Sequence, residues 1–147
     1  MAITIHPTAI VSSKAQLADN VTVEAYAIIE DDVIIGEGTV IGPHVLVANG
    51  ARIGKNCRIH VDVVIGTRPG PDDLVPTLGD NCYIGPGAKL FGAITIGPNT
   101  AIGANSVVNS SFPEGFCTIA GAPARKVSDT PSTEFIIATR SPKKTLG

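Results

Sequence analysis

The chain has 147 residues and a net charge of −2, and 44% of its residues are apolar although only 4% are aromatic and tryptophan is absent. This length predicts one domain with a core of aliphatic side chains, and the charge argues against a nucleic-acid partner. No apolar run reaches the roughly 18 residues of a membrane span, no signal-peptide layout opens the chain, and three cysteines make no disulfide framework, so we expect a cytoplasmic protein without a membrane partner.

An aliphatic residue recurs at every sixth position through most of the sequence. The first run consists of Ile5, Val11, Leu17, Val23, Ile29, Ile35, Ile41, Val47, Ile53, Ile59 and Ile65. The pattern breaks at Pro71 and resumes one residue out of phase with Leu78, Ile84, Leu90, Ile96, Ile102 and Val108. The residue two positions earlier is usually small or β-branched, and glycine often follows directly.

This period indicates short strands separated by corners. Residues i−2 and i share one face of a strand, so each repeat offers one small and one large inward side chain. We expect the glycine that follows to adopt positive φ at the corner. Stacked repeats of this kind predict a solenoid of parallel strands over residues 1–127, with a protruding loop at 67–77 and a C-terminal extension at 128–147. Within the extension, EFIIATR is expected to form a strand or a short covering segment.

The unit aliphatic-Gly-x-x-small-x resembles the hexapeptide repeat of left-handed β-helix acyltransferases over roughly residues 3–127. The resemblance implies an all-β fold, a left-handed parallel β-helix whose three-sided coils take one repeat on each side, and a homotrimer with active sites between subunits. The first half, from HPTAIV onward, resembles the UDP-N-acetylglucosamine acyltransferases of lipid A synthesis. The second half, with IGPGAKLFG, IGANSVV and AGAPARKV, resembles serine acetyltransferases and related sugar acetyltransferases.

The second resemblance implies a binding site for acetyl-CoA as the acyl donor, with no metal required. Carried over residue by residue, this site consists of Gly85, Ala88, Gly103, Ala104, Gly121, Ala122 and Arg125, with Lys126 as a basic neighbour. A long, thin thioester suits a groove of low side chains with exposed N–H groups and positive charge at its phosphate end.

The candidate catalytic residues are His60, His44 and Asp62, because acyl transfer needs a base near neutral pH. If each coil takes three repeats, every residue stacks on the equivalent residue three repeats later. One column then holds Tyr26, His44 and Asp62, and another holds His6, Glu24, Gly42 and His60. Asp62 is placed to orient His44, whereas His60 is favoured slightly because it lies close to the loop. The alternative is that both histidines are solvated turn residues.

The loop TRPGPDDLVPT interrupts a regular repeat, which favours a functional role. Asp72 and Asp73 suit an acceptor with hydroxyl or amine groups, and Arg68 suits a phosphate. We expect them to bind substrate, including substrate held by a neighbouring subunit. Cys57 and Cys82 fall in small inward positions and are expected in the core.

These features together predict a CoA-dependent acyltransferase, most simply an acetyltransferase, that acts on a hydroxyl or amine of a small polar acceptor such as a sugar, nucleotide sugar or amino acid. Three alternatives stay open: a UDP-sugar acyltransferase of the lipid A type, a non-catalytic β-helix assembly module, and a zinc carbonic-anhydrase-like protein. Binding of acetyl-CoA distinguishes the enzyme from the module.

Overall fold

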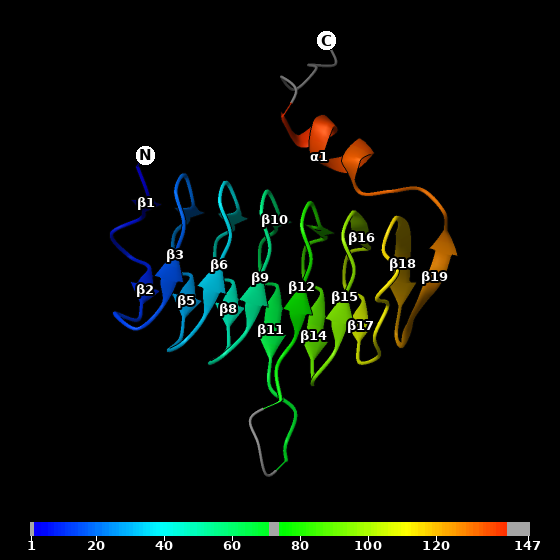
Figure 1. Cartoon of the computed structure of the whole chain (residues 1–147), viewed down its shortest axis with the longest axis horizontal. Coiled ribbons are helices and arrows are strands. Elements are labelled where there is room, and N and C mark those ends of the chain that lie inside the picture. The colour runs from blue at the N-terminus through cyan, green and yellow to red at the C-terminus, as the bar shows by residue number, and fades with distance from the viewer. Residues whose placement is uncertain (1, 71–73, 141–147) are drawn as a thin grey trace.

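The strands wind through three sheets that form the sides of a prism (Figure 1). The computed structural model describes residues 2–70 and 74–140. Sheet A contains β1 (Thr4–Ile5), β4 (Thr22–Val23), β7 (Val40–Ile41), β10 (Arg58–Ile59), β13 (Tyr83–Ile84), β16 (Thr100–Ile102), β18 (Cys117–Gly121) and β19 (Ala124–Ser128). Sheet B contains β2 (Ile10–Val11), β5 (Ile28–Ile29), β8 (Leu46–Val47), β11 (Val64–Gly66), β14 (Lys89–Phe91) and β17 (Val107–Val108). Sheet C contains β3 (Gln16–Leu17), β6 (Ile34–Ile35), β9 (Arg52–Ile53), β12 (Thr77–Leu78) and β15 (Thr95–Ile96).

Each coil of the solenoid takes one strand from each sheet, and equivalent strands pair in parallel. Thr22 of β4 pairs with Val40 of β7, which confirms that equivalent residues stack at every third repeat. Across the loop the spacing in the sequence is longer, and Arg58 of β10 pairs with Tyr83 of β13. The loop therefore lengthens one coil without breaking the ladder of any sheet.

The aliphatic residues of the six-residue repeat fill the interior, as the sequence predicts. Ile35, Ile53 and Ile84 are 1%, 3% and 0% exposed, whereas Ile5 in the first coil is 44% exposed because no coil covers it on that side. Cys57 and Cys82 are fully buried in the small inward positions, which confirms their structural role in the core. Burial of branched aliphatic side chains along the whole axis is the main stabilising term of this fold.

The predicted reason for the recurrent glycines is wrong. Gly36, directly after β6, does not have positive φ; the left-handed position lies two residues later, at Gly38 with φ of 74°. Glycine is required at position 36 because a Cβ there would lie 2.6–2.7 Å from backbone atoms of Gly54 and Lys55 in the next coil. The coils are thus in direct backbone contact at this corner.

The loop leaves the prism between β11 and β12 and projects away from it (Figure 1). At its base the Arg68 N–H donates a hydrogen bond to the Leu74 carbonyl oxygen at 3.1 Å, and the two residues form an antiparallel bridge. The strands on either side of this segment are β11, which ends at Gly66, and β12, which begins at Thr77.

Beyond the last parallel strand, β18, the chain turns back as the antiparallel strand β19 and then crosses to a helix. EFIIATR lies in this helix, α1 (Thr133–Arg140), so the strand option is wrong, and the segment covers the end of β13 instead. Ser132 is fully buried before the helix: its hydroxyl donates to the Asn81 carbonyl oxygen, and its N–H donates to the Asn99 carbonyl oxygen at 3.0 Å. In the two described stretches, no helix has the length and hydrophobicity needed to cross a membrane.

Candidate active site

The predicted catalytic residues and most predicted acetyl-CoA residues lie along one edge of the prism, where each strand of sheet A turns into sheet B. We call this the A–B edge. The first corner residue of each successive coil is His6, Glu24, Gly42, His60, Gly85 and Gly103. The columns proposed from the sequence are confirmed, because β1, β4, β7 and β10 pair in that register.

His60 is held against an aromatic wall at the middle of this edge. Its ring lies 4.8 Å from the ring of Tyr83 on β13, centroid to centroid, and the Tyr83 ring lies 5.3 Å from that of Phe135 on α1. His60 Nε2 is buried and has no hydrogen-bond partner among the described residues. Nδ1 is therefore the ring nitrogen that is left to exchange a proton with a bound molecule.

Burial lowers the pKa of His60 below its ordinary value, because the cationic ring would lose hydration. The carboxylate of Glu24 acts in the opposite direction, and the nearby Arg58 guanidinium lowers this pKa further. His60 is consequently neutral at pH 7, which is the form that accepts a proton from a substrate.

A cavity of about 150 Å³ opens beside His60 on the A–B edge. Its lining consists of Glu24, Val40, Gly42, Pro43, Arg58, Ile59, His60 and Val61. Gly42 lies between Glu24 and His60 in the column and is buried, with its backbone directly against the coil that carries His60. A Cβ at Gly42 would lie 2.7 Å from the Ile59 carbonyl oxygen, so packing also requires glycine here.

His44 and Asp62 occupy the neighbouring column, two positions further into the corner. The His44 ring stacks on Tyr26 with centroids 5.1 Å apart, and both His44 and Asp62 have positive φ, of 58° and 62°. Both are exposed, and in the described residues no hydrogen bond or ion pair joins their side chains. The catalytic role of His44 and Asp62 stays a prediction, and the burial of His60 makes it the better base.

Beyond His60 the A–B edge continues toward the C-terminal end as a line of small residues. Gly85, Gly103, Ala104, Gly121 and Ala122 follow one another there, through the pairings of β13 with β16 and of β16 with β18. Gly85 is buried beneath the next coil, whereas Ala104, Gly121 and Ala122 are exposed. Three strand spacings separate His60 from Gly121, a distance of about 15 Å.

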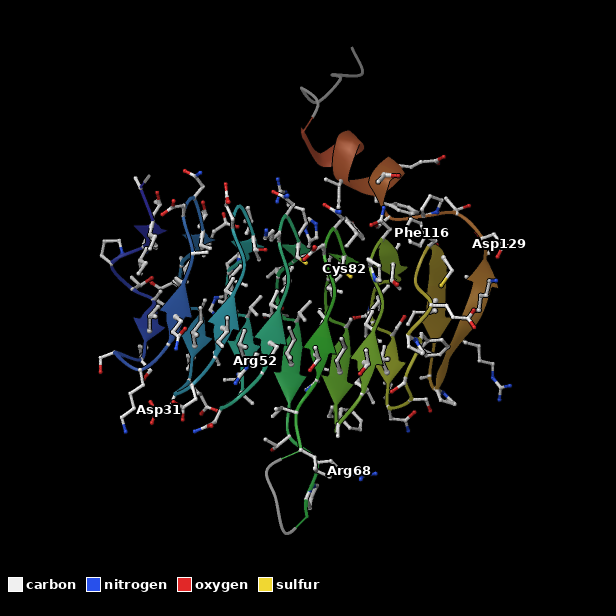
Figure 2. The ribbon with its side chains drawn as sticks, viewed as in Figure 1. Asp31, Arg52, Arg68, Cys82, Phe116 and Asp129 are labelled. Atoms are coloured by element: carbon white, nitrogen blue, oxygen red, sulfur yellow. The ribbon has the colours of Figure 1, made fainter. Side chains whose placement is uncertain are left out.

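Three predicted acetyl-CoA residues have different surroundings. Ala88 is fully buried in the core, so its side chain faces the interior and does not line a surface groove. Arg125 is exposed on β19 beside Ala120, at the end of the A–B edge. Lys126 forms an ion pair with Asp129, near the end of β19 (Figure 2), which offsets its charge.

Of the three predicted acceptor-binding residues, the structure describes Arg68, and it does not lie on this edge. Arg68 is exposed beside the loop, on the side of the prism opposite α1 (Figure 2). The loop itself leaves from the corner between sheets B and C. Asp72 and Asp73 lie outside the described residues.

Three residues around His60 were not recognised in the sequence as part of the site. Glu24 stands in the same column as His60, so its position was available from the spacing. Tyr83 pairs with Arg58 across the loop. This register follows from the one-residue phase shift of the repeat, so it was also available from the sequence. Phe135 reaches the site through the C-terminal helix, for which the sequence carries no positional signal.

The resemblance to solenoid transferases is supported by comparison with known proteins. The family described as bacterial transferase hexapeptide (six repeats) matches residues 14–49, 32–67 and 76–110. The chain belongs to this family. Within residues 2–70 and 74–140, no group of three or more histidine, cysteine, aspartate or glutamate side chains is arranged to hold a metal ion.

Individual relatives share the repeat region. A serine acetyltransferase of Staphylococcus xylosus is 44% identical over 77 residues, which cover 52% of this chain and 35% of that protein. The acetyltransferase domain of PglB from Neisseria gonorrhoeae superimposes with a TM-score of 0.78 at 24% identity, over 86% of this chain and 58% of that chain, and shows the fold to be a left-handed parallel β-helix. A serine acetyltransferase in complex with CoA has a TM-score of 0.58 at 35% identity, over 65% of this chain and 40% of that chain. The chain thus spans between about a third and a half of the length of such curated relatives.

Replacing Phe135 with alanine should raise the pKa of His60 toward its ordinary value. Phe135 backs the Tyr83 ring that buries His60, so its loss admits water and reduces the desolvation that lowers this pKa. The titration can be followed by NMR of the ring C–H signals, since the chain has only three histidines. An unchanged His60 titration would show that α1 does not control its environment.

Proposed function

We propose that this hexapeptide-repeat protein is a CoA-dependent acyltransferase, most simply an acetyltransferase, that modifies a hydroxyl or amine of a small polar acceptor. One observation carries the proposal: a half-buried neutral histidine stands on an edge of small residues that ends at an exposed arginine. The relatives that are serine acetyltransferases support the same chemistry. The resemblance of the first half to UDP-N-acetylglucosamine acyltransferases stays a prediction.

His60 supplies the base in this proposal. Nδ1 of His60 takes the proton of the acceptor as the acceptor attacks the thioester carbonyl, and it then returns a proton to the sulfur that leaves. The corner N–H groups of Gly85 and Gly103 donate to the carbonyl oxygens of Ile102 and Ile119 at 2.8 and 2.9 Å, so they are not available to the oxyanion of the tetrahedral intermediate. Placing both substrates on one rigid edge would contribute much of the rate, because the reacting atoms are held in contact.

The line of small residues from Gly85 to Ala122 is the proposed groove for acetyl-CoA. Small side chains let the pantetheine arm lie close to the backbone, and Arg125 provides positive charge for a phosphate. Lys126 is a weaker candidate, since Asp129 already neutralises it. A related structure that holds CoA supports a donor of this kind.

We also propose that the protein assembles as a homotrimer. Ile10, Ile28 and Ile34 are 64%, 41% and 36% exposed on the outer faces of sheets B and C, an apolar surface that a neighbouring copy would cover. We propose that in such an assembly Arg68, Asp72 and Asp73 of one copy contact the substrate held at the A–B edge of the next.

Purified protein should bind acetyl-CoA in the micromolar range typical of enzyme substrates and release CoA thiol when a suitable acceptor is present. Calorimetry and a thiol-reactive dye measure these two properties. Ala104→Phe should weaken acetyl-CoA binding by about tenfold or more, because it fills the groove from an exposed position without disturbing the core.

Ala93→Phe is the matched control, since Ala93 is equally exposed but lies at the corner between sheets B and C. It should bind acetyl-CoA like the unmodified protein. If neither binding nor thiol release is observed for the unmodified protein, the proposed function is wrong, and the zinc content then distinguishes a carbonic-anhydrase-like protein from an assembly module.

A further inference from the structure

The cavity beside His60 lies on the side of the ring away from the proposed donor groove. Gly85 and the groove follow His60 toward the C-terminal end of the edge, whereas Gly42 and Glu24 precede it. Glu24 and His60 are two coils apart, about 10 Å between their Cα atoms, and Gly42 places no side chain between them. A small group can therefore approach His60 from the Glu24 side.

The cavity holds one carboxylate, that of Glu24, and one guanidinium, that of Arg58. The exposed Glu24 side chain makes no hydrogen bond or ion pair with any part of the chain that the structure describes, yet it acts electrostatically on His60. Arg58, the basic residue of the cavity wall, directs Nη1 toward the carbonyl oxygens of Gly38 and Cys57, each at 3.1 Å. The Glu24 carboxylate is thus the charged group that remains available to a ligand.

We infer that this cavity is the acceptor subsite and that the group acylated is a primary amine, bound as an ammonium ion between Glu24 and His60. The inference rests on the proposed function and specifies its acceptor. A carboxylate binds an ammonium through charge-assisted hydrogen bonds, whereas a neutral hydroxyl gains much less from it. The cavity of about 150 Å³ fits the amine and its nearest carbon atoms, with the rest of the acceptor outside.

The reaction balances with these residues and acetyl-CoA. Nδ1 of His60 takes one proton from the ammonium, and the free amine attacks the carbonyl carbon so that a C–N bond forms. The C–S bond then breaks, and the sulfur receives the proton held by His60. The second proton leaves the nitrogen through the Glu24 carboxylate to solvent, so the products are an amide, CoA thiol and one released proton.

The test compares matched probes and a matched pair of variants. The unmodified protein should acetylate 2-aminoethanol and D-glucosamine, and the products should be amides that resist mild hydroxylamine. Ethylene glycol and D-glucose should react at least about tenfold more slowly, the difference that loss of one charge-assisted hydrogen bond produces. Thiol release gives the rates, and mass spectrometry after hydroxylamine treatment distinguishes amide from ester.

Glu24→Gln should raise KM for the amine probes by about tenfold or more, with a smaller change in kcat and no change in acetyl-CoA affinity. It should also lower the pKa of His60, because the carboxylate that raises it is removed. The control is Glu37→Gln, an exposed residue at the corner between sheets C and A.

Two results would overturn the inference alone: acetylation of the hydroxyl probes in preference to the amines, or an unchanged amine KM in Glu24→Gln. In both cases the protein remains an acyltransferase. A protein that neither binds nor consumes acetyl-CoA would instead remove the proposed function on which the inference rests.

Discussion

His60→Ala should lower kcat/KM for acyl transfer by about 10²–10⁴-fold, the range expected for removal of a general base. The His60 ring is half-buried, and this burial lowers its pKa. His60 also lines the cavity and lies next to the proposed donor groove. The affinity for acetyl-CoA should change little, because the groove lies beyond His60. Steady-state thiol release and calorimetry separate the two effects.

His44→Ala is the matched control for this experiment. His44 is exposed in the neighbouring column and stacks on Tyr26, so its loss should leave kcat within about threefold and the fold intact. If His44→Ala were the damaging substitution instead, the pairing of His44 with Asp62 would be the catalytic one. If both variants kept the activity of the unmodified protein, neither histidine would be the base.

Gly36→Ala should reduce the free energy of unfolding by about 2–3 kcal/mol, a large effect for one methyl group. The added Cβ would lie 2.6 Å from the carbonyl carbon of Gly54, and backbone atoms of the adjacent coil have no room to move aside. Urea denaturation followed by far-UV circular dichroism, at equal protein concentration, measures the difference.

Gly38→Asn separates this packing effect from backbone conformation. Gly38 has φ of 74°, and asparagine already occupies the same corner position one coil earlier at Asn20 and one coil later at Asn56, with φ of 61° and 56°. The substitution should change stability by less than about 0.5 kcal/mol, because asparagine tolerates the left-handed region and the nearest atom is the mobile end of the Asn56 side chain. An unchanged stability of Gly36→Ala would show that contact between the coils does not require glycine at position 36.

Much of the candidate site could be located from spacing alone. His6, Glu24, Gly42 and His60 recur at every third repeat, and the parallel ladder places them in one column. What the spacing did not reveal is the environment of that column. The pKa of His60 depends on Tyr83, which lies beyond the loop in the sequence, and on Phe135, which arrives from a helix outside the repeat.

The sequence by itself determined the interior of this protein, because a side chain's inward direction follows from strand alternation and the same six-residue pattern recurs in every coil. Ile35, Ile53 and Ile84 were placed correctly on that basis. The tertiary structure decided which residues meet across coils and which surfaces remain open. The closeness of Gly36 to Gly54, the burial of Ala88 and the covering of Tyr83 by α1 depend on distances between segments far apart in the chain, and local periodicity carries no information about those distances.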